Sequence, residues 1–404
     1  MNKKRTYLLL FVSLLLLAIG SIVWQRWNVW FGNRPEMPFV SQPYPHRLLL
    51  TLGENHTQRM LSWQQDSILQ QAEVRLTKLH TTDTLTIPSK GKIVRSRGGI
   101  TAFYSALLSN LDNNAHYAYQ IISGNNYSEW YPFATTSQNS PFSFIYIGDV
   151  QDRDTSNTSK TAFQHIQKQF PAASFWAFGG DLIERPMNSY WNAIMKDLDG
   201  IRQSTPIIAI AGNHEYLKYA IRKIDERFTY TFPYFSNNPN HNHVHTFTYN
   251  NVRFVLLDSN REPWYIWQQR NYLKEVLKSN TSLFTVVMLH HPVLSNKGKW
   301  NNLPIRLFFE PVLNEYGVDL VLQGHEHGYA RNSKKDKNNN SVPPIYITSH
   351  LSKKFYPTFS ETSTTDTLIS NKALFQHITI SKNTLTLHTY TLQGEQVDSV
   401  SIVK

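Results

Sequence analysis

Between residues 141 and 350 the chain contains five short apolar runs, and each run ends in a motif rich in Asp, Asn or His. Such runs are typical of buried strands, and helical patterns over Ser159–Phe170, Tyr190–Ile201 and Trp264–Lys278 separate several of them. Buried strands joined through helices build sheets whose carboxyl ends form the functional edge. We therefore expect an α/β core in which all five motifs meet at one sheet edge. The runs and motifs are Phe142–Ile147 with Gly148-Asp149, Ala173–Phe178 with Gly179-Gly180-Asp181, Thr205–Ile210 with Gly212-Asn213-His214-Glu215, Leu283–Leu289 with His290-His291-Pro292, and Val318–Leu322 with Gly324-His325-Glu326-His327.

Each motif taken singly also has a structural explanation. Gly-Asp is common at turns, and Gly-Asn-His-Glu could be a turn with a left-handed Asn. Gly-His-x-His is more specific, because alternation puts His325 and His327 on one side, although a single zinc or a structural site would also fit. Together, two carboxylates, one amide and three or four imidazoles would be costly to bury without a counter-ion. Mixed oxygen and imidazole donors suit two divalent ions, such as manganese, iron or zinc, for metal-assisted hydrolysis.

Composition narrows the chemistry further. The chain contains no cysteine, which excludes disulfides, thiolate metal sites and cysteine nucleophiles. The net charge of +11 attracts anions, including phosphate esters, nucleic acids and anionic lipids. The dense basic runs are confined to Lys3-Lys4-Arg5 and to 334–337, which we interpret as a targeting flank and a solvated loop. No RNA-binding signature or zinc-finger spacing accompanies them, so we predict a phosphate ester substrate and no specific nucleic-acid partner.

Residues 1–26 form a candidate membrane anchor or signal segment. The basic residues Lys3-Lys4-Arg5 precede an apolar stretch, Tyr7 to Trp24, that is nearly long enough to span a bilayer as a helix. The basic flank predicts that this end stays in the cytoplasm. A cleaved signal peptide is the alternative, because Ala18-Ile19-Gly20 offers small residues at a plausible cleavage spacing. We favour an uncleaved anchor, and both interpretations predict a membrane-anchored or secreted protein whose body is periplasmic or extracellular.

The rest of the chain divides into three parts. Residues 27–42 hold Trp, Asn, Gly and Pro and predict a tether. Residues 43–137 alternate short strand candidates with polar turns, which favours a small all-β sandwich. Its strand candidates are Arg47–Leu52, Arg59–Trp63, Ala72–Leu79, Thr101–Leu107, Ala115–Ile122 and Glu129–Thr135. Residues 141–404 hold the five motifs and a tail of strand patterns that we expect to complete a second sheet or the sheet's edges. The tail strands are Ile345–Thr348, Leu374–Ile380, Thr384–Tyr390 and Val397–Val403.

The ordered motifs GD, GGD, GNHE, HHP and GHEH resemble those of the calcineurin-like metallophosphoesterases, and within them the purple acid phosphatase group. Residues 43–136 resemble the fibronectin type III-like domain that precedes the phosphatase domain in that group, and GHEHGYAR resembles its GHxHxYxR ending. The resemblance implies an α+β/α-β fold, a four-layer β-sandwich flanked by helices. It also implies an exported, acid phosphatase-like phosphomonoesterase. The alternatives are a phosphodiesterase with the same site and a non-catalytic surface binder of phosphorylated ligands.

The resemblance assigns a role to each motif residue. The implied metal ligands are Asp149 and His327 on the first ion, Asn213, His290 and His325 on the second, and Asp181 as the bridge between them. His214 would not bind metal; it would hydrogen-bond the phosphate or protonate the leaving group. The H-x-P spacing to Pro292 selects His290 as the ligand, so His291 would point the other way and pack or line the rim.

Two positions depart from the family's pattern. The broader family often has a metal-binding His two residues after the first Asp, where this chain has Gln151. The purple enzymes have a Tyr three residues after the bridging Asp, where this chain has Glu184. Their colour comes from tyrosinate on ferric iron, so this chain should not be purple, and ferric iron at the first site is in question. Gln151, Glu184 or water would complete that site. Tyr329 and Arg331 would support it from outside the coordination sphere or serve in packing.

Two further features receive structural interpretations. His241, His243 and His245 alternate in HNHVH, and we expect them in a loop that leads into the strand Thr246–Tyr249. Asp258 follows the strand Val252–Leu257, where it would either support the site or cap a turn.

Overall fold

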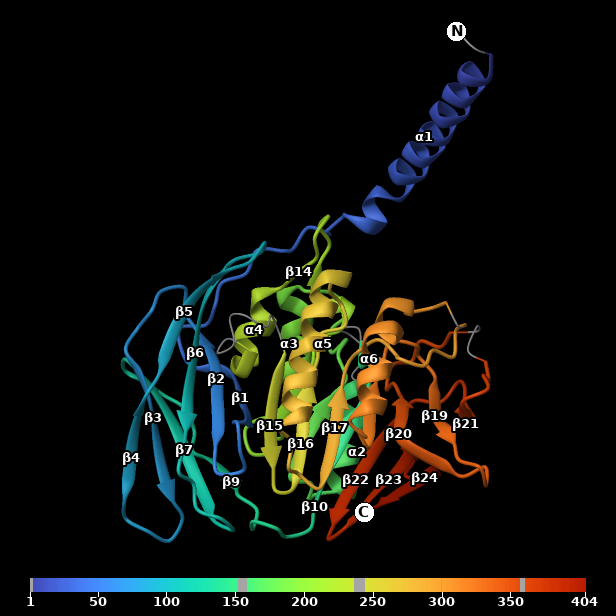
Figure 1. Cartoon of the computed structure of the whole chain (residues 1–404). Helices are drawn as coiled ribbons and strands as arrows, with labels where there is room; N and C mark the ends of the chain where they lie inside the picture. Colours follow the sequence, from blue (N-terminus) through green and yellow to red (C-terminus); the bar gives the residue numbers. More distant parts are fainter. Residues whose placement is uncertain (1–2, 152–157, 236–243, 299, 357–359) are drawn as a thin grey trace.

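The computed structural model describes residues 3–151, 158–235, 244–298, 300–356 and 360–404. It begins with one long helix, α1 (Lys3–Trp30), which projects away from the rest of the molecule (Figure 1). No residue of α1 is buried. By length and composition this helix could cross a membrane, and a signal sequence near an N-terminus has the same properties. The helix continues past the apolar stretch predicted to end at Trp24, through a segment that contains Trp27 and Trp30.

Residues 46–134 form an all-β domain, as predicted. Its strands are β1 (His46–Leu52), β2 (Arg59–Gln65), β3 (Ala72–Lys78), β4 (Thr84–Pro88), β5 (Lys90–Arg95), β6 (Ile100–Leu108), β7 (His116–Ser123), β8 (Asn126–Tyr127) and β9 (Tyr131–Ala134). They form one sheet of order β1-β2-β6-β5 and a second of order β4-β3-β7-β8, with β9 paired to β7. The core between the sheets includes the stacked rings of Trp63 and Tyr104, whose centroids are 5.4 Å apart. Alternation along β3, where Val74 and Leu76 are buried, supplies this core from one face of the strand.

The second part of the chain contains two larger sheets. The first has the order β12-β11-β10-β22-β23-β24 and the second the order β15-β16-β17-β18-β20-β19-β21. The strands of the first sheet are β10 (Phe142–Ile147), β11 (Phe175–Phe178), β12 (Ile207–Ala209), β22 (Leu374–Ser381), β23 (Thr384–Thr391) and β24 (Gln396–Val403). The strands of the second are β15 (His245–Tyr249), β16 (Val252–Leu256), β17 (Phe284–Met288), β18 (Leu320–Gln323), β19 (Tyr329–Lys335), β20 (Ser341–Thr348) and β21 (Thr365–Ile369). A short hairpin, β13 (Tyr216–Leu217) and β14 (Lys223–Ile224), lies outside both sheets.

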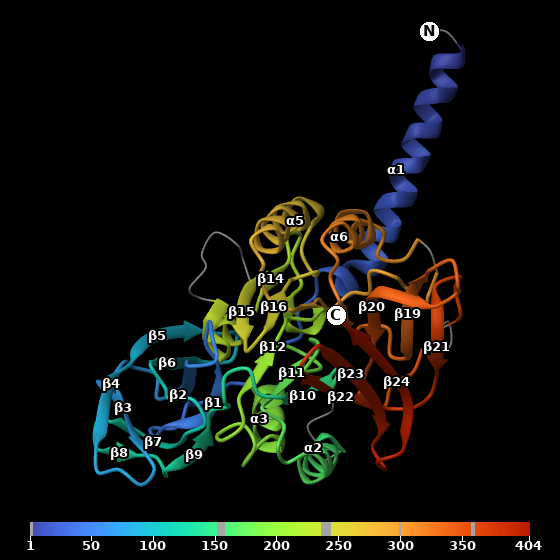
Figure 2. The ribbon, with the colours of Figure 1, turned by 60° about the horizontal axis from the view of Figure 1, so that its bottom comes forward.

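Helices cover the outer faces of the two sheets, which gives the four layers that we expected. The α-helices of this part are α2 (Thr158–Gln169), α3 (Asn188–Asp197), α4 (Glu226–Thr231), α5 (Pro263–Lys278) and α6 (Leu303–Glu315). Figure 2 shows α5 and α6 on one side of the sheets and α2 and α3 on the other. Burial follows the period of two: Val287 packs toward α5 and α6, whereas its neighbours Val286 and Met288 face the core between the sheets.

One expectation about the sheets is wrong. We expected all five motifs at the edge of one sheet, but β10, β11 and β12 belong to the first sheet, whereas β17 and β18 belong to the second. Within each sheet these strands run parallel, so their carboxyl ends lie on the same side. The two edges lie next to each other because the sheets pack face to face, and the motifs therefore still meet.

The histidine-rich segment before β15 is only partly described. His241 and His243 lie outside the described residues. His245 is the first residue of β15, and its ring stacks on that of Tyr234 with centroids 4.9 Å apart. Burial lowers the pKa of His245 to about 4, so this imidazole is neutral and serves packing.

Candidate metal centre

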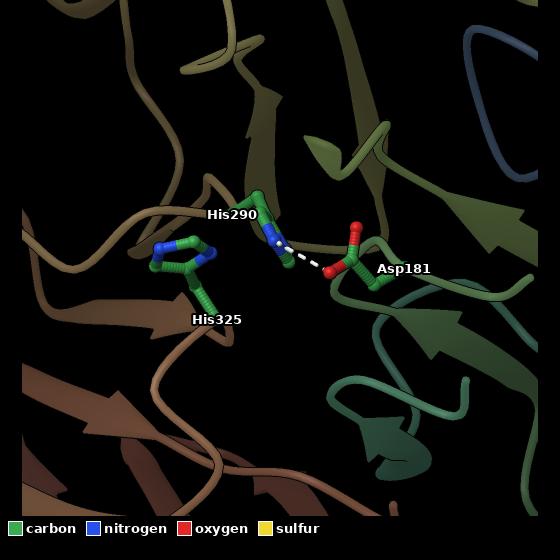
Figure 3. A group of neighbouring side chains, drawn as sticks. All are labelled: Asp181, His290 and His325. Atoms are coloured by element: carbon green, nitrogen blue, oxygen red, sulfur yellow. Dashed lines mark ion pairs between the residues drawn. The ribbon is translucent and has the colours of Figure 1, made fainter. Parts of the chain in front are cut away.

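All six predicted ligands lie together where five loops meet. Asp149 follows β10, Asp181 follows β11 and His290 follows β17. Asn213 begins a single 3-10 turn after β12, and His325 and His327 lie in the loop between β18 and β19. In Figure 3 the side chains of Asp181, His290 and His325 point toward one another from three different loops. Each of these three residues offers a ligand atom, and the three atoms lie within 4.8 Å of one another.

The two carboxylates are buried among the imidazoles. Asp149 Oδ1 accepts a hydrogen bond from the backbone N–H of His325 at 2.9 Å, and its Oδ2 lies 3.3 Å from His327 Nε2. Asp181 Oδ2 lies 3.2 Å from His290 Nε2, and Asp149 Oδ1 lies 3.6 Å from His290 Nδ1. Asn213 brings a third candidate ligand oxygen to the cluster, and this Oδ1 lies 2.9 Å from His325 Nδ1. Both carboxylates therefore face the same small space as the imidazoles.

Backbone carbonyls orient three of the imidazoles. Nδ1 of His290 lies 2.8 Å from the carbonyl oxygen of Gly179, and Nδ1 of His327 lies 3.0 Å from that of Lys354. Nδ1 of His214 lies 2.6 Å from the carbonyl oxygen of Glu184. A nitrogen that faces a carbonyl must carry the proton, so Nε2 of each ring is the free nitrogen and faces the site. Metal-binding histidines have this arrangement, which fits His290 and His327, and in His214 the same arrangement presents Nε2 to a substrate.

The loops adopt unusual backbone conformations at the site. Gln151, Asp181, His325 and His327 have φ values of 40°, 51°, 71° and 48°, in the left-handed region that residues other than glycine rarely occupy. Such strain concentrates at functional sites. The loops also approach closely: a Cβ on Gly212 would lie 2.1 Å from Asp181 Oδ1, which requires glycine at this position.

Glu215 is an organising residue to which the sequence analysis gave no role. Its side chain is fully buried and accepts hydrogen bonds from the backbone N–H groups of Gly212 at 2.7 Å, Asp181 at 2.9 Å and Ile183 at 3.3 Å. It therefore ties the loop after β11 to the loop after β12. Burial, and then the charge of Asp181, raise the pKa of Glu215 to about 8. Its position at the end of the GNHE motif was the feature of the sequence that could have indicated this role.

The electrostatics of the cluster favour a cation. Burial raises the pKa of Asp149, whereas the nearby His290 and His327 act to lower it. Burial alone would also raise the pKa of Asp181, but His290 and His214 hold it below its ordinary value. Burial would lower the pKa of His290, yet Asp181 and Asp149 raise it to about 10. The two carboxylates thus favour a proton on the buried imidazole of His290. A bound metal ion would displace this proton.

Donor chemistry also fits metal ions. Asp149 Oδ2 is buried, and apart from its contact with His327 Nε2 it has no hydrogen-bond partner among the described residues, which is unusual for a buried carboxylate oxygen. Oxygen and imidazole donors in this proportion suit divalent ions of intermediate softness. The residues present therefore fit the metal centre that the sequence predicts.

The two residues at the departures from the family's pattern are engaged with protein groups. The Nε2 amide of Gln151 donates to Asp181 Oδ2 at 2.7 Å. The carboxylate of Glu184 forms an ion pair with Lys354, whose ammonium also donates to Gln151 Oε1 at 3.3 Å. Lys354 was not predicted to lie at the site. The pair of adjacent lysines, Lys353-Lys354, was the only feature of the sequence that could have indicated it. Glu184 is thus held by a lysine beside the site.

Tyr329 and Arg331 lie in a separate polar cluster between the sheets. Arg331 Nε donates to Asp398 of β24 at 2.9 Å, and its Nη1 lies 3.3 Å from Asp366 of β21. The Tyr329 hydroxyl donates to Asp398 at 2.7 Å. Arg331 thus links β19 of the second sheet to β24 of the first, and these contacts favour the packing role, one of the two roles expected for Arg331, over a role at the metal site.

Replacing Arg331 with Ala should therefore lower stability and leave metal binding unchanged. The substitution leaves the carboxylate of Asp398, which is 8% exposed, without the Arg331 cation, and leaves Asp366, which is 3% exposed, with Lys335 as its remaining cation. We expect a loss of about 3 kcal/mol, at the low end for a buried ion pair, seen as a lower thermal unfolding midpoint. Arg306→Ala is the matched control, because the Arg306–Glu310 pair on α6 is more exposed and surface pairs contribute about 0–1 kcal/mol. Loss of metal from the folded Arg331 variant would contradict this assignment.

His291 and Asp258 lie at the border of the cluster. The His291 ring lies against His325, with centroids 4.2 Å apart, and its Nδ1 lies 3.0 Å from the Ser259 hydroxyl. Burial lowers the pKa of His291 well below its ordinary value, so it lines the rim as a neutral ring. Asp258 accepts hydrogen bonds from the Tyr216 hydroxyl and, at 3.0 Å, from the backbone N–H of Asn260. The second contact is a turn cap, one of the two roles expected for Asp258.

Two protein families match the chain. The calcineurin-like phosphoesterase family matches residues 142–329, and the purple acid phosphatase N-terminal domain matches residues 45–135. Two curated relatives from Arabidopsis thaliana are a probable purple acid phosphatase 20, 25% identical over 253 residues, and purple acid phosphatase 5, 26% identical over 269 residues. These alignments cover 59% and 61% of this chain, and 57% and 62% of the relatives. The chain thus spans less than two thirds of the length of these relatives.

Solved structures share the fold. Purple acid phosphatase PPD1 from yellow lupin seeds superposes with a TM-score of 0.73 at 16% identity, over 90% of this chain and 75% of that protein. PhoD superposes with a TM-score of 0.63 at 13% identity, over 90% of this chain and 94% of that protein. The purple acid phosphatase family uses a dinuclear metal centre. The chain therefore contains a calcineurin-like phosphoesterase domain, preceded by a domain that matches the N-terminal domain of the purple acid phosphatases.

Proposed function

We propose that the chain is an exported phosphomonoesterase that works with two divalent metal ions. The observation that carries the proposal is the meeting of Asp149, Asp181, Asn213, His290, His325 and His327 in one buried cluster, with His214 at its edge. Asp149 and His327 would hold the first ion, Asn213, His290 and His325 the second, and Asp181 both. The proposed metals are manganese, iron or zinc, and at the position of the purple enzymes' tyrosine this chain has Glu184, which pairs with Lys354.

The chain's own residues would orient and protonate the substrate. The chemistry supplied by a bound metal pair is activation of water and neutralisation of charge on the phosphate. His214 is fixed at two points, because its backbone N–H donates to Asp181 Oδ1 at 2.8 Å and its Nδ1 binds the Glu184 carbonyl. Its side chain is 28% exposed and its Nε2 lies 4.0 Å from Asp181 Oδ2. Protonated at Nε2, His214 can donate to the leaving-group oxygen as a general acid.

Location outside the cytoplasm is the second part of the proposal. The apolar helix α1 follows three basic residues, Lys3-Lys4-Arg5, which favours a cytoplasmic N-terminus and an exported body. An uncleaved α1 would hold the phosphoesterase domain at the membrane surface that faces away from the cytoplasm, whereas cleavage would release the domain.

Hydrolysis assays with defined metals test the function. The purified full chain, loaded with manganese, zinc or iron, should hydrolyse 4-nitrophenyl phosphate faster than bis(4-nitrophenyl) phosphate, and a chelator should abolish both activities. Readdition of the metal should restore the activity. Preference for the diester would establish the phosphodiesterase alternative. Tight metal binding without turnover of either ester would contradict the proposal and indicate a binder of phosphorylated ligands.

A further inference from the structure

We infer that the candidate site takes its substrate from the membrane in which α1 anchors the chain. The substrate is then a lipid with an ester-linked phosphate in its head group. The inference rests on the proposed phosphoesterase function and adds the class of substrate. Its basis is that the end of α1 and the tether after it form walls of the two cavities that reach Asn213.

The larger cavity joins the site to the membrane helix. It has a volume of about 580 Å³ and lies between the β13–β14 hairpin, the start of α5 and the start of α6. Asn213 and His291 of the candidate site belong to its lining, and so do Val29, Trp30 and Phe31. Figure 1 shows the hairpin that carries β14 rising toward the lower end of α1, and the Lys218 ammonium of this hairpin donates to the Val29 carbonyl at 3.0 Å.

The smaller cavity also joins the candidate site to the segment that leaves the membrane helix, and Asn213 belongs to its lining too. It has a volume of about 120 Å³. His214, the proposed general acid, lines it together with Glu184, and Gly32–Arg34 of the tether also belong to the lining. A phosphate ester beside Asn213 and His214 would therefore lie next to the segment that leaves the membrane.

The tether is bound to the phosphoesterase domain. The Glu36 side chain is 2% exposed and forms an ion pair with Arg227, itself 3% exposed, which also pairs with Asp225 at 2.8 Å. The Asn33 side chain accepts from the backbone N–H of Lys218 at 2.9 Å and donates to its carbonyl at 2.8 Å. Breaking a buried ion pair is costly, so these contacts hold the cavities at a fixed distance from the end of α1.

The positions of the tryptophans place the cavities at the depth of lipid head groups. Trp24, Trp27 and Trp30 are exposed near the outer end of α1, and tryptophan concentrates at the interface between membrane and water. At a rise of about 1.5 Å per residue, Trp30 lies about 9 Å beyond Trp24. The head-group layer on each side of the hydrocarbon core is about 5–8 Å thick. The wall formed by Val29–Phe31 is therefore at or just outside this layer.

The surface around the cavities suits an anionic membrane. Among the described residues that line the larger cavity, Lys218, Arg222 and Arg261 are basic and Glu262 is acidic. Partial burial is the main cause that lowers the pKa of Lys218, and the nearby Arg185, Arg222 and Arg34 lower it further, so these arginines add their positive charge to the same surface.

Exposed apolar side chains lie beside these cations. Tyr219 and Ile221 of the loop between β13 and β14 are 48% and 58% exposed, and Trp264 in the first turn of α5 is 53% exposed. Basic and exposed apolar residues together are characteristic of surfaces that contact lipid head groups.

The reaction at this position would be hydrolysis of the lipid phosphate. The oxygen of water forms a bond to phosphorus as the bond from phosphorus to the lipid oxygen breaks. The lipid leaves as an alcohol with a proton from His214, and a proton of the attacking water restores the protonated His214. The lipid alcohol stays in the bilayer, and inorganic phosphate diffuses away.

Lengthening the link between α1 and the tether tests the inference. The full chain is reconstituted into vesicles that contain phosphatidic acid, and 4-nitrophenyl phosphate is added outside as a soluble ester for the same outward-facing molecules. Twenty Gly and Ser residues between Gly32 and Asn33 would span about 25 Å and leave the Asn33 and Glu36 contacts in place. We expect the ratio of lipid to soluble hydrolysis to fall by at least about 10-fold, because a long link lowers the effective concentration of head groups at the site.

The matched control is the same insertion between Asn338 and Asn339. This turn precedes β20, which runs parallel to β18, so it lies at the end of the sheet opposite the site. The control should keep the ratio of the unmodified chain. An unchanged ratio in the Gly32–Asn33 insertion would overturn the inference and leave the phosphoesterase function standing. Hydrolysis of the soluble ester without hydrolysis of phosphatidic acid would do the same, whereas no hydrolysis of either ester would refute the proposed function itself.

A second measurement needs no variant. Phosphatidic acid is placed either in the vesicles that carry the unmodified chain or in separate vesicles that carry no protein. A site held at its own membrane should hydrolyse the first pool and spare the second. Equal rates on the two pools would contradict the inference, even if the insertion variant did not fold.

Discussion

Replacing Asp181 with Asn should remove bound metal and reduce kcat/KM for a phosphomonoester by at least about 1000-fold. Loss of a partner outside the coordination sphere already costs about 10- to 100-fold in metal affinity or activity, and Asp181 is the proposed bridge. Its Oδ2 lies 3.2 Å from His290 Nε2, and its carboxylate is 1% exposed. A neutral amide would leave this position without the charge that attracts both ions. Elemental analysis of the purified variant and 4-nitrophenyl phosphate hydrolysis measure the two effects.

Asp258 is the matched control for this substitution. It is also a fully buried carboxylate that follows a strand of the same domain, β16, but it binds the Tyr216 hydroxyl and the Asn260 backbone. Asp258→Asn should lower the thermal unfolding midpoint and keep the metal content of the unmodified chain. An Asp181→Asn variant that retained two ions per chain would show that Asp181 does not bridge them.

His214→Ala should keep the metals and lose catalysis. General acid catalysis contributes about 10²–10⁴-fold, and we expect kcat for an alkyl phosphate to fall within this range. The loss should be smaller for 4-nitrophenyl phosphate, because its leaving group needs less protonation. This dependence on the leaving group separates a proton donor from a residue that only positions the loop, since a positioning role would reduce both rates alike.

The comparison for His214 is His165→Ala, which removes an exposed imidazole from α2. This control should retain the rates on both esters. Metal loss in the His214 variant, measured by elemental analysis, would show that the ring belongs to the coordination sphere and would refute its assigned role.

Strong local signals predicted most of the secondary structure. The limits predicted for β10, Phe142–Ile147, agree with the structure, because a buried parallel strand reads as a continuous apolar run. Strands β4 and β5 were not among the strand candidates, and both are short and mostly exposed. Helix α6 was missed because Pro311, which lies inside it, argues against a helix, yet Phe309, Val312 and other side chains pack on the second sheet and stabilise it.

The candidate site was predicted residue by residue, while its surroundings were not. The ligand types follow strands in a fixed order, so the motifs themselves identified which donors would meet. Nothing local shows that the Glu184 carboxylate pairs with Lys354, 170 residues later, or that Arg331 pairs with Asp398, 67 residues later. Such pairs depend on which loops and sheets lie side by side, and a charged side chain has the same local pattern with any partner.

The amino-acid sequence by itself determined the strands, the oxygen and imidazole donors that follow them, and an apolar N-terminal segment, because these depend on neighbours a few residues apart. The tertiary structure decided that two sheets rather than one supply the donors, and that Glu36 and Arg227 hold the tether so that Val29–Phe31 lie beside Asn213. The physical reason is that packing and burial join residues that are remote along the chain, and their energy depends on the whole fold rather than on any local run of residues.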